Sequence, residues 1–392
     1  MTPSARVQAA IDILDEVIAA ARDDGPPADS IVAAYFKTRR YAGSKDRRAV
    51  RELVFRAIRR SGEIPEAGRS AMLGLSADDR EILKSFTGPP HGPEPVEKGE
   101  KRTRPSLIPQ WVERELSPLV GPSEWPALVQ RAPLDIRVNT ARTTREAIAE
   151  TFPGAEPTPI SPWGLRLRAD TRVDQSLSFA EGLVEVQDEG SQLIALACAA
   201  KPGMRIIDLC AGAGGKALAL AAATGNGVEI IACDTNRQRL QKLSPRADRA
   251  GATITTQLLN PPREAIELTH LAATADLVLV DAPCSGSGTW RRSPEGRWRL
   301  TPHRLERVAA LQARVLDLAA PLVKPGGALV YAVCSLIGRE GADQIAAFLG
   351  RHSGWSVQEP LDGVGRADGP GRLLTPGHDD TDGFFVARLI RS

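Results

Sequence analysis

Three short motifs, each placed where an apolar run gives way to small residues, constrain this chain more than any other feature. They are the glycine-rich loop CAGAGGK at residues 210–216, DAPCSGSG at 281–288 and YAVCSL at 331–336. If the apolar runs are parallel strands, all three motifs lie at the carboxyl ends of strands, where open α/β sheets bind their ligands. We therefore expect one site built from these three loops.

The pattern around the motifs, from about residue 186 onward, alternates apolar strands with helices. This alternation predicts βαβ units and a parallel, Rossmann-like α/β sheet over residues 186–392. The predicted strands are 205–209, 229–234, 276–281 and 328–333, with closing strands at 355–357 and 384–389. The predicted helices are 191–199, 216–223, 236–250, 302–320 and 339–349.

The first 87 residues predict a small all-helical domain. Apolar residues recur every three or four positions over 3–22, where Thr2 is the expected cap, and further helices are expected over about 31–41, capped by Ser30, and 46–60. A solvated face is the ordinary interpretation of a charge run, but this one is so unbalanced in sign that it equally favours contact with an RNA backbone. Its basic residues are Lys37, Arg39, Arg40, Lys45, Arg47, Arg48, Arg51, Arg56, Arg59 and Arg60.

The middle of the chain predicts a linker and a second small domain. Residues 88–106 are rich in proline, glycine and charge, which is typical of a linker. Residues 107–185 predict a small α/β domain, with helices near 109–119 and 143–151 and strands near 134–139, 163–168 and 183–186. Arg137 and Asn139 are either solvent-facing strand residues or RNA contacts.

Composition excludes several classes of protein. Five cysteines, an odd number spread over 392 residues, indicate reduced thiols rather than a disulfide framework. With no CxxC pair and five histidines, a metal site is not expected. No apolar run or signal-peptide pattern predicts a membrane segment or export, so we expect a cytoplasmic monomer. The net charge of +2 means that nucleic acid would be bound by local patches.

The glycine loop predicts a nucleotide-type cofactor. Its glycines let the backbone approach a ligand, and the helix that follows favours an anionic group at its first turn. Asp234 ends the next strand about 20 residues further on, the spacing at which an acid reaches ribose hydroxyls. The loop lacks both the GxGxxG and the GxxxxGK[ST] spacing, and S-adenosylmethionine binds similar strand ends.

The acid and the two thiols of the later motifs match the needs of cytosine methylation. Carbon 5 of cytosine is a poor nucleophile until a thiolate adds to carbon 6, and a carboxyl group at ring nitrogen 3 offsets the developing charge. A second thiol assists the later loss of the proton from carbon 5. Asp281, Cys284 and Cys334 supply these groups. The other cysteines are interpreted as core residues, namely Cys198, Cys210 and Cys233.

The same motifs resemble those of the Sun-type (RsmB-like) RNA cytosine-C5 methyltransferases. VQDEGSQL at 186–193, RVNT at 137–140 and GFFVARL at 383–389 resemble that family as well. The resemblance runs from about residue 107 to the C-terminus, and residues 1–87 resemble more loosely the NusB-like RNA-binding domain of the rRNA-methylating branch. It implies a class-I methyltransferase fold, S-adenosyl-L-methionine as cofactor and RNA, with small-subunit rRNA as the expected substrate.

The resemblance also implies a role for each site residue. Cys334 is the expected nucleophile, Cys284 assists product release, and Asp281 contacts the cytosine and lies near the cofactor. At Asn260 the family tends to have an acid near the adenine, and at Ala213 it usually has proline. The expected cofactor site comprises Cys210, Ala211, Gly212, Ala213, Gly214, Gly215, Lys216, Asp234, Asn260 and Asp281.

Three alternatives stay open at this point. The same chemistry on tRNA is one, a non-catalytic RNA-binding assembly factor is another, and a nicotinamide-dependent reductase is the third. The acid and thiol pair argues against the second, because binding alone needs no thiols, and the DAPCSG motif argues against the third. The basic, aromatic loop at 290–299 is expected to grip phosphates around the target base, to close the core with its tryptophans, or to do both.

Overall fold

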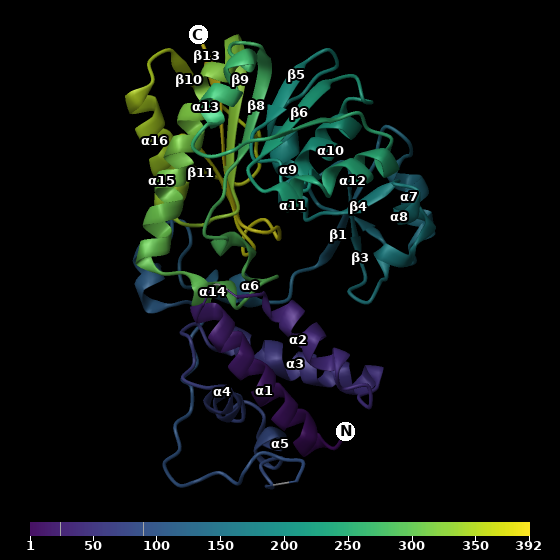
Figure 1. Ribbon diagram of the computed structural model, residues 1–392, viewed down its shortest axis with the longest axis vertical. Coiled ribbons are helices and arrows are strands. Elements are labelled where there is room, and N and C mark those ends of the chain that lie inside the picture. Colours follow the sequence, from purple (N-terminus) through teal and green to yellow (C-terminus); the bar gives the residue numbers. More distant parts are fainter. Residues whose placement is uncertain (24, 89) are drawn as a thin grey trace. The chain divides into compact units, whose positions relative to one another are not determined.

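The computed structural model describes residues 1–23, 25–88 and 90–392 (Figure 1). The chain divides into two compact units. The helical unit contains Met1–Leu116, Gly121–Arg131 and Thr289–Pro302, and the sheet unit contains Ser117–Val120, Ala132–Gly288 and His303–Ser392. This division does not follow the domain boundaries predicted at residues 87, 106 and 185, and those boundaries stay predictions.

The helical unit is built from short helices around one apolar core. They are α1 (Pro3–Arg22), α2 (Ala28–Lys37), α3 (Ser44–Arg60), α4 (Gly68–Leu75), α5 (Arg80–Leu83), η1 (Gln110–Arg114), α6 (Trp125–Val129) and α14 (Gly296–Arg299).

The first helix confirms its prediction. The Thr2 hydroxyl accepts a hydrogen bond from the Ala5 N–H (3.1 Å), and Pro3 occupies the first turn, where a missing N–H costs nothing. The predicted start of the second helix, with Ser30 as its cap, is wrong. Helix α2 begins at Ala28, because the Glu295 carboxylate accepts from the Ala28 N–H (3.0 Å) and caps the helix from a distant part of the chain.

The basic, aromatic segment Thr289–Pro302 belongs to the helical unit. Trp298 lies in the core of this unit and donates its indole N–H to the Ser61 carbonyl (2.7 Å). Arg297 is 1% exposed and donates to the Ile58 carbonyl (2.6 Å), and burial lowers the pKa of Arg297 to about 9. These two side chains close a core, as one of the two interpretations of this loop expects, and the contact of the loop with phosphates stays a prediction.

The sheet unit contains a small antiparallel sheet in the order β2-β3-β1-β4. Its apolar core includes Ile136, Val138, Ile148 and Leu165. The elements are β1 (Leu134–Val138), α7 (Arg145–Thr151), β2 (Glu156–Pro157), β3 (Gly164–Leu167), η2 (Val173–Gln175), α8 (Leu177–Ala180) and β4 (Val184–Val186).

Arg137 and Asn139 attach this small sheet to the larger one. Arg137 is 3% exposed and donates to the Gly215 carbonyl (2.8 Å) and to the Gln187 side chain. The Asn139 amide donates to the carbonyls of Gly182 (3.0 Å) and Ala250 (2.9 Å). Both side chains are buried, so neither of the two roles considered for them, solvent-facing residue or RNA contact, is correct.

The large sheet has nine strands in the order β11-β12-β13-β9-β8-β5-β6-β7, with β10 paired to β13. Strands β5 to β9 are parallel, and β13 runs antiparallel to β9. The strands are β5 (Arg205–Asp208), β6 (Glu229–Asp234), β7 (Thr255–Leu258), β8 (Ala275–Asp281), β9 (Val323–Val333), β10 (Trp355–Gln358), β11 (Arg366–Asp368), β12 (Gly371–Leu374) and β13 (Phe384–Arg391).

Helices cover both faces of the large sheet, with α9, α10 and α12 on one side and α15 and α16 on the other (Figure 1). The single helix predicted over 236–250 is wrong, because Pro245 can occupy only a first turn and a new helix starts at Leu243. The elements are α9 (Glu189–Ala197), α10 (Gly215–Ala223), α11 (Arg237–Leu240), α12 (Leu243–Ala250), α13 (Glu264–Glu267), η3 (Thr269–Leu271), η4 (Ser287–Thr289), α15 (Pro302–Ala319), η5 (Ala320–Leu322), η6 (Gly338–Glu340) and α16 (Ala342–Arg351).

The strand order reverses between β5 and β8. From β5 the chain proceeds outward to β6 and β7, whereas β8 returns to the other side of β5 and leads to β9. Such a switch point opens a crevice at the carboxyl ends of the strands. All three motifs follow strands at this edge. Among the described helices, none is both long and apolar enough to cross a membrane.

Candidate active site at the switch point of the large sheet

The glycine loop between β5 and α10 is shaped by close contacts. Gly212 and Gly214 have φ angles of +56° and +81°, which side chains disfavour. A Cβ atom at Gly212 would lie 2.5 Å from the Arg239 guanidinium, and one at Gly214 would lie 2.5 Å from Leu243. Helix α10 begins at Gly215, so its free N–H groups face this loop. The loop is a backbone cradle at a helix N-terminus.

Asp234, at the end of β6, holds this loop in place. Its carboxylate accepts from the N–H groups of Gly212 (2.7 Å) and Asn236 (2.6 Å). Each oxygen keeps a second lone pair that a ligand hydroxyl could use. The predicted ribose contact is therefore compatible with the geometry and stays a prediction.

Asn260 lies beside the end of β6, because the preceding N–H, of Leu259, donates to the Asp234 carbonyl (3.0 Å). The Asn260 backbone and side-chain N–H groups both donate to the Glu267 carboxylate (2.8 and 3.0 Å), and these hydrogen bonds lower the pKa of Glu267. A carboxylate therefore does lie at this corner, but it comes from Glu267, which the sequence pattern did not single out.

Lys216 and Asp281 join the glycine loop to the end of β8. The Lys216 ammonium lies 2.6 Å from the Asp281 carboxylate. Burial lowers the pKa of Lys216, but the charge and hydrogen bond of Asp281 outweigh burial and leave that pKa raised. The lysine is thus charged, and it also lies within electrostatic reach of Cys334.

Cys284 and Cys334 lie together at the ends of β8 and β9. Their Sγ atoms are 3.3 Å apart, and both residues are partly exposed. The strand register explains this, because Asp281 pairs with Ala332 and the two loops leave adjacent strands side by side. The hydrogen bond to Cys334, burial and the nearby charge of Glu340 all raise the pKa of Cys284 well above its usual value.

Glu340, which the sequence analysis missed, fastens the two cysteine loops to each other. It is fully buried, and its carboxylate accepts from the Ser285 N–H (2.8 Å), the Ser335 hydroxyl (2.5 Å) and the Gln312 amide (2.9 Å). Ser285 follows one cysteine and Ser335 follows the other. The sequence offered one hint of such a residue. Each of the two cysteines is followed by a serine, whose hydroxyl and backbone N–H need an acceptor when they are buried.

Further hydrogen bonds, in which Ser287 and Gly288 take part, connect the two cysteine loops. The Ser287 hydroxyl lies 3.0 Å from that of Ser335 and accepts from the Leu336 N–H (2.9 Å). The Gly288 N–H donates to the Cys334 carbonyl (3.0 Å). The backbone on both sides of each thiol is therefore tied to the other loop, which fixes the separation of the sulfurs.

Asp208, at the end of β5, is a second buried acid that the sequence analysis did not assign to the site. It is 1% exposed, and burial followed by the charge of Asp281 raises the pKa of Asp208 to about 7. Within the described part of the chain its Oδ1 has no hydrogen-bond partner. A buried carboxylate oxygen that accepts no hydrogen bond is typical of a ligand site, because polar atoms buried in a core are normally paired.

The predicted site residues therefore converge at one edge of the sheet, with Asn260 at its margin. Cys198 and Cys233 are buried, as core cysteines should be, and Cys198 donates to the Ile194 carbonyl (3.4 Å). Among the described residues, no group of three or more histidine, cysteine, aspartate and glutamate side chains is arranged to hold a metal ion.

Several known proteins are similar to this chain in sequence or in fold. The ribosomal RNA small subunit methyltransferase B of Salmonella typhi is 34% identical over 296 residues, which cover 73% of this chain and 66% of that protein. A methyltransferase homologue from Pyrococcus horikoshii is 26% identical, with a TM-score of 0.60 over 69% of this chain and 90% of its own. The solved protein PH0851 has a TM-score of 0.75 over 99% of both chains at 23% identity, which establishes similarity of fold.

A family comparison completes these findings. The chain spans about 66% of the length of the curated relatives it matches. Residues 195–390, half of the chain, match the family described as 16S rRNA methyltransferase RsmB/F, and this range contains the glycine loop, Asp281 and both cysteines. By that match, this chain belongs to the RsmB/F family of 16S rRNA methyltransferases.

Proposed function

We propose that this protein methylates carbon 5 of a cytosine in RNA, with S-adenosylmethionine as methyl donor and 16S-type small-subunit rRNA as substrate. The observation that carries the proposal is the cluster of two thiols 3.3 Å apart beside the Lys216–Asp281 ion pair. Binding RNA requires no thiol pair, whereas addition to a pyrimidine ring requires one thiolate and benefits from a second thiol.

The residues present fit the cofactor. Gly212 and Gly214, with φ angles of +56° and +81°, would leave the loop backbone bare beside the cofactor, and helix α10 would present its N-terminus to a carboxylate group. Asp234 would accept from the ribose hydroxyls, and the carbonyl oxygen of Asn260 would accept from the adenine amino group. When bound, S-adenosylmethionine supplies the methyl group as an electrophile on a sulfonium.

Cys334 is the proposed nucleophile. Its neighbour Lys216 is a cation, and the Cys334 thiolate would add to carbon 6 of the cytosine and form a carbon–sulfur bond. The Asp281 carboxyl group, which accepts a hydrogen bond from Lys216, would contact ring nitrogen 3 of the cytosine. Carbon 5 then becomes nucleophilic enough to accept the methyl group.

Cys284 is the proposed base for the release step. Its raised pKa makes the thiolate a strong base once its own proton has passed to solvent. That thiolate takes the proton from carbon 5, the ring electrons re-form the double bond, and Cys334 leaves as a thiolate. The electrostatic contrast between Lys216 near one sulfur and Glu340 near the other supports this division of labour.

The substrate and the RNA-binding regions are part of the proposal. The curated relatives named ribosomal RNA small subunit methyltransferase B support rRNA, and this chain spans 66% of their length. The proposed RNA-binding parts are the NusB-like region 1–87 and the small α/β region 107–185, with 88–106 as their connection and 186–392 as the catalytic domain.

A trapping experiment tests the proposal. Cys284→Ala protein is mixed with S-adenosylmethionine and bacterial RNA, and a denaturant-resistant protein–RNA adduct is sought on a gel. We expect an adduct that disappears in the Cys284→Ala/Cys334→Ala double variant and in Cys334→Ala alone. Sequencing the trapped RNA then identifies the cytosine.

The other outcomes distinguish the alternative substrate, mechanism and function. An adduct formed with tRNA alone would show that tRNA is the substrate in place of rRNA and would leave the proposed cytosine chemistry unchanged. Normal methylation by Cys334→Ala would overturn the covalent mechanism. No adduct with any RNA and no methyl transfer by the unmodified protein would leave a non-catalytic RNA-binding factor.

A further inference from the structure

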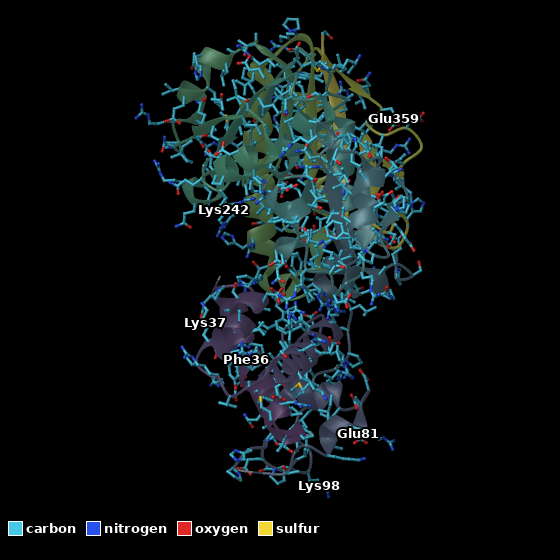
Figure 2. All side chains as sticks on the ribbon, turned by 90° about the vertical axis from the view of Figure 1, so that its right-hand side faces the viewer. Phe36, Lys37, Glu81, Lys98, Lys242 and Glu359 are labelled. Atoms are coloured by element: carbon cyan, nitrogen blue, oxygen red, sulfur yellow. The ribbon has the colours of Figure 1, made fainter. Side chains whose placement is uncertain are left out.

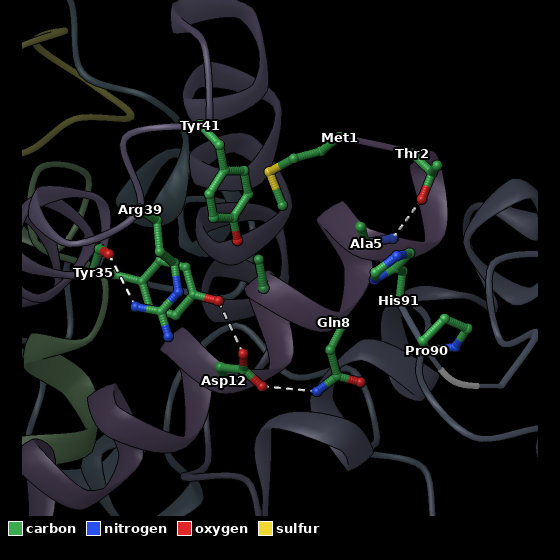
Figure 3. A pocket seen from close by; sticks show the side chains of 11 residues that line it. Met1, Thr2, Ala5, Gln8, Asp12, Tyr35, Arg39, Tyr41, Pro90 and His91 are labelled. Carbon is green, nitrogen blue, oxygen red and sulfur yellow. Dashed lines mark hydrogen bonds between the residues drawn. The ribbon is translucent and has the colours of Figure 1, made fainter.

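The helical unit contains a pocket that the proposed chemistry does not use. Its volume is about 470 Å³, within the roughly 300–1,000 Å³ typical of ligand sites. Helix α1 supplies Gln8 and Asp12, the end of α2 and the turn after it supply Tyr35, Arg39 and Tyr41, and His91 lies opposite (Figure 3).

One wall of the pocket is a stack of flat groups. The Arg39 guanidinium lies 3.6 Å from the centre of the Tyr35 ring and donates to the Tyr35 carbonyl (3.1 Å), so its plane is fixed. The Tyr41 ring beside it is 74% exposed, an unusual position for a large aromatic side chain. Unstacked nucleobases bind to such arginine planes and aromatic rings.

The floor of the pocket is a carboxylate with unused acceptor capacity. Asp12 accepts one hydrogen bond from the Tyr35 hydroxyl (2.9 Å) and one from the Gln8 amide (2.7 Å), one on each oxygen. A carboxylate has about four lone-pair sites, so one acceptor remains on each oxygen. Two adjacent acceptors match the two adjacent donors on the Watson–Crick edge of guanine, N1–H and the 2-amino group.

Other bases fit this floor less well. Adenine and cytosine each present one amino donor next to a ring-nitrogen acceptor, which a carboxylate repels. Uracil presents one N–H between two carbonyl oxygens. The pocket floor therefore selects guanine by the same donor–acceptor logic that proteins use to read single-stranded RNA.

The surface beside the pocket suits a polyanion. Lys37, Arg40, Lys45 and Arg48 are exposed on α2, α3 and the turn between them, and Figure 2 shows Lys37 at the surface of the unit. The nearby acid Asp46 is neutralised by Arg6 (2.8 Å). A strand of RNA can thus place its phosphates on the basic residues while one base enters the pocket.

We propose that this pocket binds a single unpaired guanine of the RNA substrate, stacked on Tyr41 and Arg39 and read by Asp12. The inference rests on the proposed function in one respect, that the ligand is RNA. The site holds the RNA by a base other than the one that is methylated, which adds sequence selectivity to the charge-based contact of the basic face.

The test is a fluorescence anisotropy titration of the full chain. The probes are labelled oligouridines that carry one central guanosine, inosine, adenosine or uridine. Inosine keeps N1–H and lacks the 2-amino group, so it reports on one of the two contacts. We expect the guanosine probe to bind about tenfold or more tighter than the adenosine and uridine probes, with inosine between them.

Two substitutions separate stacking from base reading. Tyr41→Ala should weaken binding of every probe about tenfold, and Tyr41→Phe should restore it. Asp12→Asn replaces one acceptor with a donor, so it should lose the preference for guanosine and favour adenosine. Arg48→Ala is the matched control and should weaken all probes equally and reduce the salt dependence.

The outcomes are decisive. Equal affinity of the unmodified protein for guanosine and adenosine probes, or an unchanged dissociation constant for Tyr41→Ala, would show that the pocket does not bind an unpaired guanine. Because Asp12 also holds Tyr35, thermal melts of each variant confirm that it is folded. Methyl transfer to bacterial rRNA is measured on the same samples, so that a failed pocket with active protein, and a working pocket with inactive protein, are told apart.

Discussion

The Sγ atoms of Cys284 and Cys334 lie 3.3 Å apart although the residues are 50 positions apart in the chain. We therefore expect the thiol-oxidising agent diamide to join them in a disulfide, with the two hydrogens transferred to diamide. The mass should fall by two hydrogens, methyl transfer should stop, and dithiothreitol should restore both. Intact mass spectrometry and peptide mapping check this.

The remaining thiols provide the control for that oxidation. Cys198 and Cys233 are only 1% and 0% exposed, so diamide cannot reach their thiols and they should stay reduced. Cys284→Ala protein should lose no mass under the same treatment. A disulfide that involves any of the other cysteines would contradict the geometry.

Glu340 should set the ionisation of Cys284. Replacing it with glutamine keeps an oxygen that can accept from Ser285 and Gln312 and removes the negative charge that helps to raise the pKa of Cys284. In a Cys334→Ser background, we expect the Glu340→Gln change to shift the pH profile of Cys284 alkylation to lower pH. Iodoacetamide kinetics followed by mass spectrometry measure that profile.

Two variants of Glu340 separate the effect of its charge on Cys284 from its role in holding the two cysteine loops. Glu340→Ala removes the acceptor of the Ser285 N–H and the Gln312 amide, at about 1–3 kcal/mol for each donor left unpaired, so it should lower the melting temperature clearly. If the glutamine variant is folded and its alkylation profile is unchanged, the charge of Glu340 has no influence on the thiol.

Asp208 should make stability depend on pH. Its pKa is raised by burial from 3.8 to about 7, so the folded state keeps a proton that the unfolded state loses. This contribution is fully present below about pH 4 and is lost as the pH rises to about 7. Asp208→Asn should therefore melt at a higher temperature than the unmodified protein at pH 8, with the difference disappearing near pH 4. Calorimetric melts across this range check it, and a constant difference would show that folding does not shift the pKa of Asp208.

Asp234 should be needed both for the glycine loop and for the cofactor. Asp234→Ala removes the acceptor for the Gly212 N–H and the proposed ribose contact, so we expect S-adenosylhomocysteine to bind at least about tenfold more weakly. Asp234→Asn keeps one acceptor and should lose less. Isothermal titration calorimetry measures both, and unchanged affinity in the alanine variant would remove Asp234 from the cofactor site.

Local patterns predicted the large parallel sheet of the chain well. Strand β6 was predicted residue for residue, and β5, β8 and β9 were found, because a buried parallel strand is a continuous apolar run that ends in small residues. The cluster of Asp281, Cys284 and Cys334 followed from the same logic, since carboxyl ends of neighbouring parallel strands meet at one edge.

Long-range partners explain what the sequence could not predict. Arg137 read as a solvent-facing strand residue, yet it is buried because the Gly215 carbonyl, 78 residues away, accepts its hydrogen bond. Glu340 had no local signal, because its partners Ser285 and Gln312 come from two other elements. The strand pair β11 and β12 was missed because it is short and mixed in polarity.

The return of Thr289–Pro302 to the helical unit has a consequence for synthesis on the ribosome. Arg297 and Trp298 occupy the interior of that unit, so helices α1 to α4 cannot complete their core when they first emerge. Proteolysis of stalled nascent chains ending after residue 131 and well after residue 302 would measure this, with protection expected only for the longer chain. The helices at the N-terminus are synthesised first, but their core is complete only after β5 to β8 have been translated. The helical unit therefore folds late, whereas N-terminal domains usually fold first during synthesis.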